Sequence, residues 1–201
     1  MSLEVLSTVA SIGTFMVIGA TAIAALVQLR HMRSSNQIAA LTEVRETLES
    51  DRFAQARRYA LEVVPKLVSD PAGREQLGAP PPMSQELESI RMLANFFENV
   101  GAFVRYGIID RELACDVWSF VVIDTWENLE PAIAIRRQRF PQVWTNFEWL
   151  AVICEDWQRR HPDGAVPPGQ HRMQFSERSR NAVAAWQAEQ GNASEPYSSP
   201  K

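Results

Sequence analysis

The sequence is poor in the residues on which metal sites, redox sites and nucleic-acid interfaces depend. Its 201 residues include two cysteines, Cys115 and Cys154, and three histidines. The cysteines are far apart along the chain and have no metal or redox spacing, which favours a reducing compartment over a disulfide-stapled secreted domain. The formal net charge is -4, so no broad basic field exists to neutralise phosphates. We therefore expect no nucleic-acid partner.

Catalytic motifs are also missing. The sequence has no glycine-rich phosphate loop, no His-Glu-x-x-His or Cys-x-x-Cys pair and no Gly-x-Ser-x-Gly elbow, and its histidines are scattered. We expect no enzyme activity, no metal and no cofactor. The alternation of apolar and polar residues that marks a half-buried strand is absent too, which predicts an all-α chain.

What the sequence does have is a long uncharged segment near its start. Residues 5–29 contain no charged side chain. As a helix with a rise of about 1.5 Å per residue they would span roughly 37 Å, more than the roughly 30 Å of a bilayer's hydrocarbon core. A cleavable signal peptide would instead carry positive charge before a shorter apolar stretch. We predict one N-terminal transmembrane helix, with residues 1–33 as anchor and basic flank.

The charges around this segment predict its orientation. Arg30, His31 and Arg33 follow it, whereas Glu4 precedes it. By the positive-inside rule the N-terminus lies outside the cell and the C-terminal domain is cytoplasmic, as in a single-pass protein of the inner membrane. Arg30 and Arg33 are then placed to contact anionic lipid head groups of the bilayer.

Small residues also form a stripe along the segment. They recur every three or four positions, a pattern that brings two membrane helices close together. The span is rich in alanine and threonine on every face, so the pattern leaves both a monomer and a homo-oligomer through the transmembrane helix open. The stripe comprises Ala10, Gly13, Val17, Ala20, Ala24 and Gln28.

Residues 34–161 are predicted to form a cytoplasmic helical domain. Apolar residues recur at helical spacing, with a break near Ser50 and Asp51. Pro65 disfavours continuation of the second helix. Residues 69–83, with four prolines and two glycines, are predicted to be a loop.

The later helices have recognisable boundary signals. Ser84 is a candidate N-cap, Gly107 a left-handed C-cap and Asp110 the N-cap of the next helix. Pro131 should kink or restart that helix, and Pro141 should open the last one, which ends near His161. Packing of the apolar stripes predicts an antiparallel helical bundle.

The tail, residues 162–201, is polar and rich in Pro, Ser and Gly, so we expect it to be mostly disordered. Within it, residues 175–188 could form a short basic amphipathic helix. Such a helix could dock on the bundle, on a partner or on the bilayer.

Two blocks of the sequence carry a family resemblance. They are Asn95-Phe96-Phe97-Glu98-Asn99-Val100-Gly101, continuing to Asp110, and Trp126-Glu127-Asn128-Leu129-Glu130-Pro131-Ala132-Ile133 with Arg137. Over residues 5–157, without 69–83, the chain resembles the bacterial domain-of-unknown-function family 4760. The resemblance implies an N-terminal membrane anchor and a helical cytoplasmic region, and no established activity.

Polar residues in these blocks form the candidate site. At helical spacing Asn95, Glu98 and Arg105 fall close to one face. The first interpretation is a polar network that sets how this helix packs on the helix that follows Asp110, and the alternative is a small ligand or partner held by Glu98 and Arg105. The complete candidate set is Asn95, Glu98, Arg105, Asp110, Trp126 and Glu127.

Three functional hypotheses follow. The favoured one is a membrane-anchored cytoplasmic interaction or regulatory module with an unknown protein partner. The second is a self-assembling membrane effector, for instance in stress or phage defence. The third is a cryptic hydrolase or nuclease, which would require a cleft with clustered carboxylates or histidines.

Overall fold

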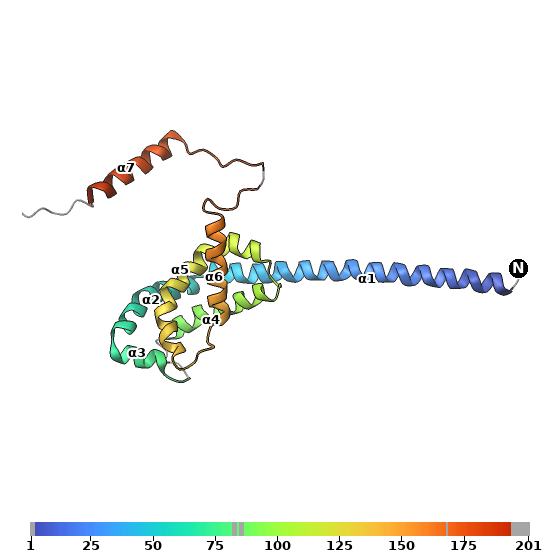
Figure 1. Ribbon diagram of the computed structural model, residues 1–201, viewed down its shortest axis with the longest axis horizontal. Coiled ribbons are helices and arrows are strands. Elements are labelled where there is room, and N and C mark those ends of the chain that lie inside the picture. Colours follow the sequence, from blue (N-terminus) through green and yellow to red (C-terminus); the bar gives the residue numbers. More distant parts are fainter. Residues whose placement is uncertain (1–2, 82–83, 85–86, 168, 194–201) are drawn as a thin grey trace, which may run out of the picture. The chain divides into compact units, whose positions relative to one another are not determined.

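The chain folds entirely as helices. The computed structural model describes residues 3–81, 84, 87–167 and 169–193, and within these ranges it contains seven α-helices and no strand (Figure 1). The all-α prediction is therefore confirmed. The helices are α1 (Leu3–Leu48), α2 (Asp51–Ser69), α3 (Pro71–Gly78), α4 (Glu88–Arg105), α5 (Arg111–Arg137), α6 (Thr145–Arg160) and α7 (Glu177–Ala193).

Helix α1 is a single unbroken helix whose two ends differ in environment (Figure 1). Its segment Ile12–Leu29 is long and apolar enough to cross a membrane, and none of it is buried in the protein. Near the other end Val44 is only 3% exposed and belongs to the hydrophobic core. Ser50 then caps α2 by accepting a hydrogen bond from the Phe53 amide. The predicted break at Ser50 is confirmed.

The predicted loop over residues 69–83 is wrong in its first half, because α3 occupies Pro71–Gly78. The Asp70 carboxylate accepts a hydrogen bond from the Gly73 amide at 3.0 Å. Pro71 follows as the first helical residue, where its missing N–H costs no hydrogen bond. A Cβ on Gly73 would lie 2.4 Å from the Leu67 carbonyl oxygen, so glycine allows α3 to turn back closely onto α2.

Prolines elsewhere were also poor guides to helix boundaries. Pro65 lies inside α2 and Pro131 inside α5, and both helices continue through them. In α2, Pro65 has no N–H to donate to the carbonyl of Leu61. Leu61 is exposed, so water can donate to this carbonyl instead. Pro141 does not open α6, which begins at Thr145 after Trp144 in the left-handed region (φ 55°).

The start of α4 also differs from the prediction. Ser84 is not its N-cap: its carbonyl accepts from the Leu87 amide at 3.0 Å, and the helix begins at Glu88. Leu87 is completely buried, so packing, rather than a capping side chain, places this end. The predicted boundaries at Gly107 (φ 71°) and at Asp110, whose carboxylate accepts from the Leu113 amide, are confirmed.

A row of aromatic rings connects four helices through the core. Phe53 of α2 packs edge-on against Phe97 of α4, which stacks on Phe147 of α6 with ring centroids 5.0 Å apart. Trp126 of α5 packs edge-to-face against the same Phe147 at 5.1 Å. Phe97 and Phe147 are essentially inaccessible to solvent. Burial of this row holds α6 between α4 and α5.

The described residues after Pro162 belong to a second unit. Within its described part, helix α7 spans Glu177–Ala193. It overlaps residues 175–188, for which a short helix was one possibility, but it begins two residues later and ends five residues later. Ser176 caps it, with its hydroxyl accepting from the Ser179 amide at 3.3 Å.

Candidate functional site

The candidate residues of α4 gather at the first turn of α6. A helix N-terminus leaves amide groups without intrahelical acceptors, and at α6 the Trp144 side chain makes no capping hydrogen bond. Glu98 supplies the acceptor from the neighbouring helix: its Oε2 accepts from the Phe147 amide and its Oε1 from Asn146 Nδ2, both at 2.9 Å. The carboxylate thus caps α6 from α4, where the positive end of the helix dipole favours it.

Asn95 and Arg105 bind the same turn on either side of Glu98. The Trp144 indole donates to Asn95 Oδ1 at 2.8 Å, and Arg105 donates to Asn146 Oδ1 at 3.1 Å. These three residues of α4 therefore form a polar network, but it joins α4 to α6, whereas the expected network was between α4 and α5. We call Asn95, Glu98, Arg105, Trp144 and Asn146 the α4–α6 network.

Close approach of the two helices makes this network possible. Gly101 lies on α4 between Glu98 and Arg105 and is buried. A Cβ built on Gly101 would lie 2.3 Å from the Asn146 carbonyl oxygen and 2.7 Å from its carbonyl carbon. Any side chain here would push the α6 backbone away from Glu98.

Two adjacent arginines at the end of α5 bind different parts of the fold, and Arg137 binds the connection into α6. Arg137 donates to the carbonyls of Val143 and Trp144 and to the Glu148 carboxylate at 2.8 Å. Its guanidinium also lies over the Trp126 ring, 5.7 Å from the centroid. The adjacent Arg136 is buried, and this burial lowers the pKa of its guanidinium.

Arg136 connects the same region to α3. It donates to the Leu77 and Ala79 carbonyls at 3.0 and 3.2 Å, at the end of that helix. These are carbonyls that the helix end leaves without amide partners. The guanidinium therefore replaces the lost helical bonds and ties α3 to α5.

The other predicted site residues lie elsewhere or have different contacts. Asp110 is the N-cap of α5 and is not part of the α4–α6 network. Trp126 contributes a ring to the core. Glu127 is exposed, and no hydrogen bond or ion pair joins its carboxylate to another described residue. The side chains of Arg30 and Arg33 lie outside the part of the chain that the structure describes.

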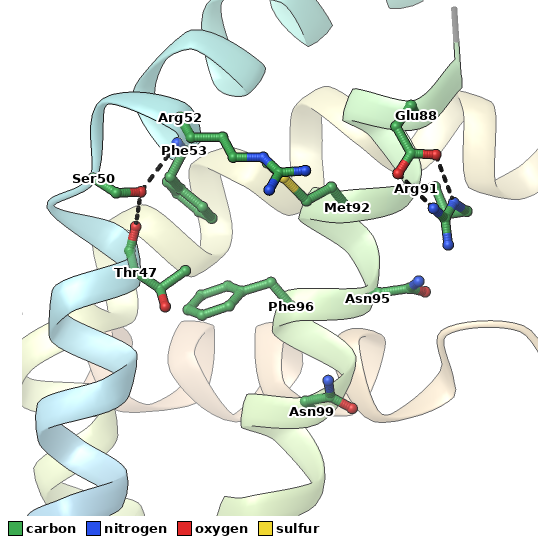
Figure 2. Close-up of a pocket in the computed structure, with 10 residues that line it drawn as sticks. All are labelled: Thr47, Ser50, Arg52, Phe53, Glu88, Arg91, Met92, Asn95, Phe96 and Asn99. Atoms are coloured by element: carbon green, nitrogen blue, oxygen red, sulfur yellow. Dashed lines mark hydrogen bonds and ion pairs between the residues drawn. The ribbon is translucent and has the colours of Figure 1, made fainter. Parts of the chain in front are cut away.

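A groove opens beside the network, between the α1–α2 junction and α4 (Figure 2). It has a volume of about 390 Å³. Phe53 and Phe96, with ring centroids 5.1 Å apart, give it an aromatic wall. Glu88 and Arg91 form an ion pair at its edge, and Arg52 extends from α2 toward Met92. We call this the α2–α4 groove; its lining also includes Thr47, Ser50, Asn95 and Asn99.

The groove combines apolar walls with donors and acceptors at its edge. Arg52 has no ion-pair partner among the described residues, and the Oδ1 of Asn95 is occupied by the Trp144 indole. Asn95 therefore belongs to both the network and the groove, and its amide group remains as a donor. This arrangement suits an apolar segment with polar groups at its margins.

The two cysteines, distant in sequence, are neighbours in the fold. Cys115 of α5 and Cys154 of α6 are buried free thiols whose sulfurs lie 3.9 Å apart. The hydrogen bond to Cys115 and burial raise the pKa of the Cys154 thiol. Across the described residues, no three His, Cys, Asp or Glu side chains come close enough to hold a metal ion.

We expect these thiols to be unreactive while the protein is folded, because reaction with a disulfide reagent requires an accessible thiolate. At pH 8 Ellman's reagent should detect neither thiol in the native chain and both in guanidinium chloride. Rapid labelling of the native protein would contradict the burial of this pair.

Comparison with known proteins identifies the family. The model of the family described as "Domain of unknown function (DUF4760)" matches residues 15–157, well over half of the chain. The chain belongs to the DUF4760 family. The matched region begins within α1 and ends in α6, so it includes residues 69–83, which the sequence resemblance had left out, and excludes α7. No curated protein and no solved structure matches the chain.

In this DUF4760 chain, Glu98→Ala should destabilise the fold by about 2 kcal/mol, since it removes two hydrogen bonds to a charged acceptor and a helix cap. Urea unfolding of the full chain in mild detergent, followed by tryptophan fluorescence, measures this loss. The matched control is Glu127→Ala, an exposed position where the change should stay within about 0.5 kcal/mol. Equal effects of the two substitutions would contradict the capping role of Glu98.

Proposed function

We propose that the chain is a membrane-tethered helical interaction module, with α1 as a single-pass anchor in the inner membrane of a bacterium. The observation that carries the proposal is the exposure of Ile12–Leu29. A predominantly apolar helical segment of 18 residues with no burial in the protein would expose a large apolar surface to water. A bilayer supplies the apolar surroundings that the fold does not.

The same helix connects the anchor to the folded domain. From Leu29 to Val44, which is buried in the core, α1 rises about 22 Å, so the domain would sit close to the bilayer. The basic residues Arg30, His31 and Arg33 after the span favour a cytoplasmic domain and an external N-terminus. In this proposal α4, α5 and α6 form an antiparallel bundle, and no catalytic step is involved.

The α2–α4 groove is the surface we assign to a protein partner. Its aromatic wall and its charged edge match the apolar centre and polar rim of protein interfaces. It lies where α1 meets α2, beside the last turn of the helix that enters the core. A partner bound here would contact the tether and the domain together.

Membrane fractionation tests the anchor. The full chain should pellet with membranes, resist alkaline carbonate and dissolve in detergent. Val17→Arg places a charge near the middle of the span, at a cost of about 2.5–3.5 kcal/mol, and should shift protein to the soluble fraction. Ala39→Arg, an exposed stem position, should not. Wild-type chain that stays in the supernatant without detergent would overturn the proposal.

Self-assembly through the span is the second candidate function, and the exposed surface of α1 favours it. A Cβ on Gly13, which belongs to the small-residue stripe, would meet no atom within 4 Å, so this side of the span is open to a second helix. Photo-crosslinkers separate the candidates. A product of twice the 22.7 kDa chain mass from a probe at Ala20 supports assembly. A cross-link to a different protein from a probe at Met92 in the groove, and none from a probe at Val152, an exposed position of α6, supports the interaction module.

A further inference from the structure

The unit that contains α7 exposes large apolar side chains. Met173 is 94% and Phe175 73% exposed, and on α7 Val183 and Trp186 are about half exposed. Soluble surfaces usually carry such side chains singly, whereas four within 14 residues indicate a surface that contacts something apolar. None of these residues lies in the family match.

The cationic residues are arranged around this apolar surface. At about 100° per residue, Val183 and Trp186 lie some 60° apart on one face of α7, and Arg178 and Arg180 lie on its two sides. Glu177 is on the opposite face, and Glu189 is close to the helix end. The described residues after Pro162 contain three arginines and three carboxylates, and Arg172 pairs with Asp163 at 3.9 Å. The charges that flank the apolar face at the start of α7 are therefore those of Arg178 and Arg180.

The start of the helix keeps the preceding apolar residue next to the basic ones. Arg180 donates to the Phe175 carbonyl at 2.7 Å, and the Ser176 hydroxyl caps the first turn. Phe175 is therefore held beside the first turn of α7 while its side chain remains exposed. The unit thus presents aromatic and aliphatic groups flanked by guanidinium groups.

We propose that α7 lies on the surface of an anionic lipid bilayer, with Phe175, Val183 and Trp186 at the acyl boundary and the arginines at the head groups. Tryptophan and arginine are the side chains suited to these two depths. Arginines in this place attract anionic lipids, each contributing on the order of 1 kcal/mol. The same charges give no attraction to an uncharged apolar surface.

This inference rests on the proposed anchor, because a tethered α7 needs only a narrow apolar face to bind the bilayer. Two apolar positions on one helix give weak binding alone, but a chain already held at the membrane binds a second time at high effective concentration. The 14 residues before α7, 163–176, can extend to at most about 46 Å, and the stem from Leu29 to Val44 is about 22 Å. The connection is long enough for α7 to return to the bilayer.

Site-specific fluorescence on the full chain in vesicles tests the inference. An environment-sensitive label on Val183→Cys reports the apolar face, and one on Ala184→Cys, on the other side of α7, is the matched control. The native cysteines are buried, so labelling is confined to the introduced thiol. Vesicles contain either phosphatidylcholine alone or phosphatidylcholine with phosphatidylglycerol.

The expected result is a blue shift for the label at position 183 in the anionic vesicles only. High salt or the double change Arg178→Gln and Arg180→Gln should abolish the shift, and the label at position 184 should not respond. Equal emission of the label at position 183 in both kinds of vesicle, with or without a blue shift, would overturn the inference. An α7 that docks on the rest of the chain, or that stays in solution, would not respond to the charge of the lipid. Loss of the chain from floated vesicles after carbonate treatment would instead mean failure of the anchor.

Discussion

Gly101→Ala should destabilise the folded domain by about 3 kcal/mol, at the upper end of the usual cost of overpacking. The new methyl group would meet the Asn146 carbonyl at 2.3 Å, and a backbone carbonyl at the start of a helix has little freedom to move aside. Relief requires α4 and α6 to separate, which stretches the hydrogen bonds of Glu98 and Arg105. Urea unfolding of the full chain in detergent measures the loss.

Gly78 provides a control substitution that should not lower the stability of the protein. A Cβ on Gly78, at the end of α3, would meet nothing within 4 Å. Gly78→Ala should therefore leave the stability unchanged or raise it by up to about 1 kcal/mol, because alanine is the better helix former. A Gly101→Ala protein as stable as the Gly78→Ala protein would mean that the two helices are not in close contact.

Phe147→Ala should have an effect of similar or larger size, about 3–5 kcal/mol. Phe147 has no exposed surface, stacks on Phe97 and receives the edge of Trp126, so its loss leaves a cavity where α4, α5 and α6 meet. Phe147→Leu, which keeps much of the volume, should cost far less. In differential scanning calorimetry we expect the highest unfolding midpoint for the wild-type protein, a somewhat lower one for Phe147→Leu and the lowest for Phe147→Ala.

Phe120→Ala is the matched control for this cavity. Phe120 is on α5 but is 76% exposed, so its removal should change the stability by no more than about 0.5 kcal/mol. If both phenylalanine substitutions were equally damaging, Phe120 would have to be covered in solution. If neither were, the aromatic row would not hold the core.

Helix identity and several boundaries could be predicted from the sequence because their signals are local. Asp110 and Gly107 act through hydrogen bonds and backbone angles within a few residues, and the structure contains both. Prolines were less informative, since their effect depends on whether the lost hydrogen bond faces solvent, as at Leu61, or falls at a helix start, as at Pro71. That information is not local.

Only the α4 residues of the candidate site could be predicted from the sequence. Asn95, Glu98 and Arg105 were recognisable as a polar face of α4, but their partners Trp144 and Asn146 lie more than 40 residues away. Glu98 caps a helix that it does not belong to, and a cap of this kind has no sequence spacing. The small residue Gly101 was the available signal, since a glycine inside a helix often marks close approach of another backbone.

The continuity of α1 has a mechanical consequence. No proline or glycine interrupts the helix between Ala20 and Leu48, so the apolar segment and the residues packed into the core share one torsional axis. Each residue inserted into the stem would turn the Val44 side of the helix by about 100° relative to the span, whereas seven residues would nearly restore the register. A rotation of the apolar segment about the helix axis would therefore also turn Thr47, which lines the α2–α4 groove.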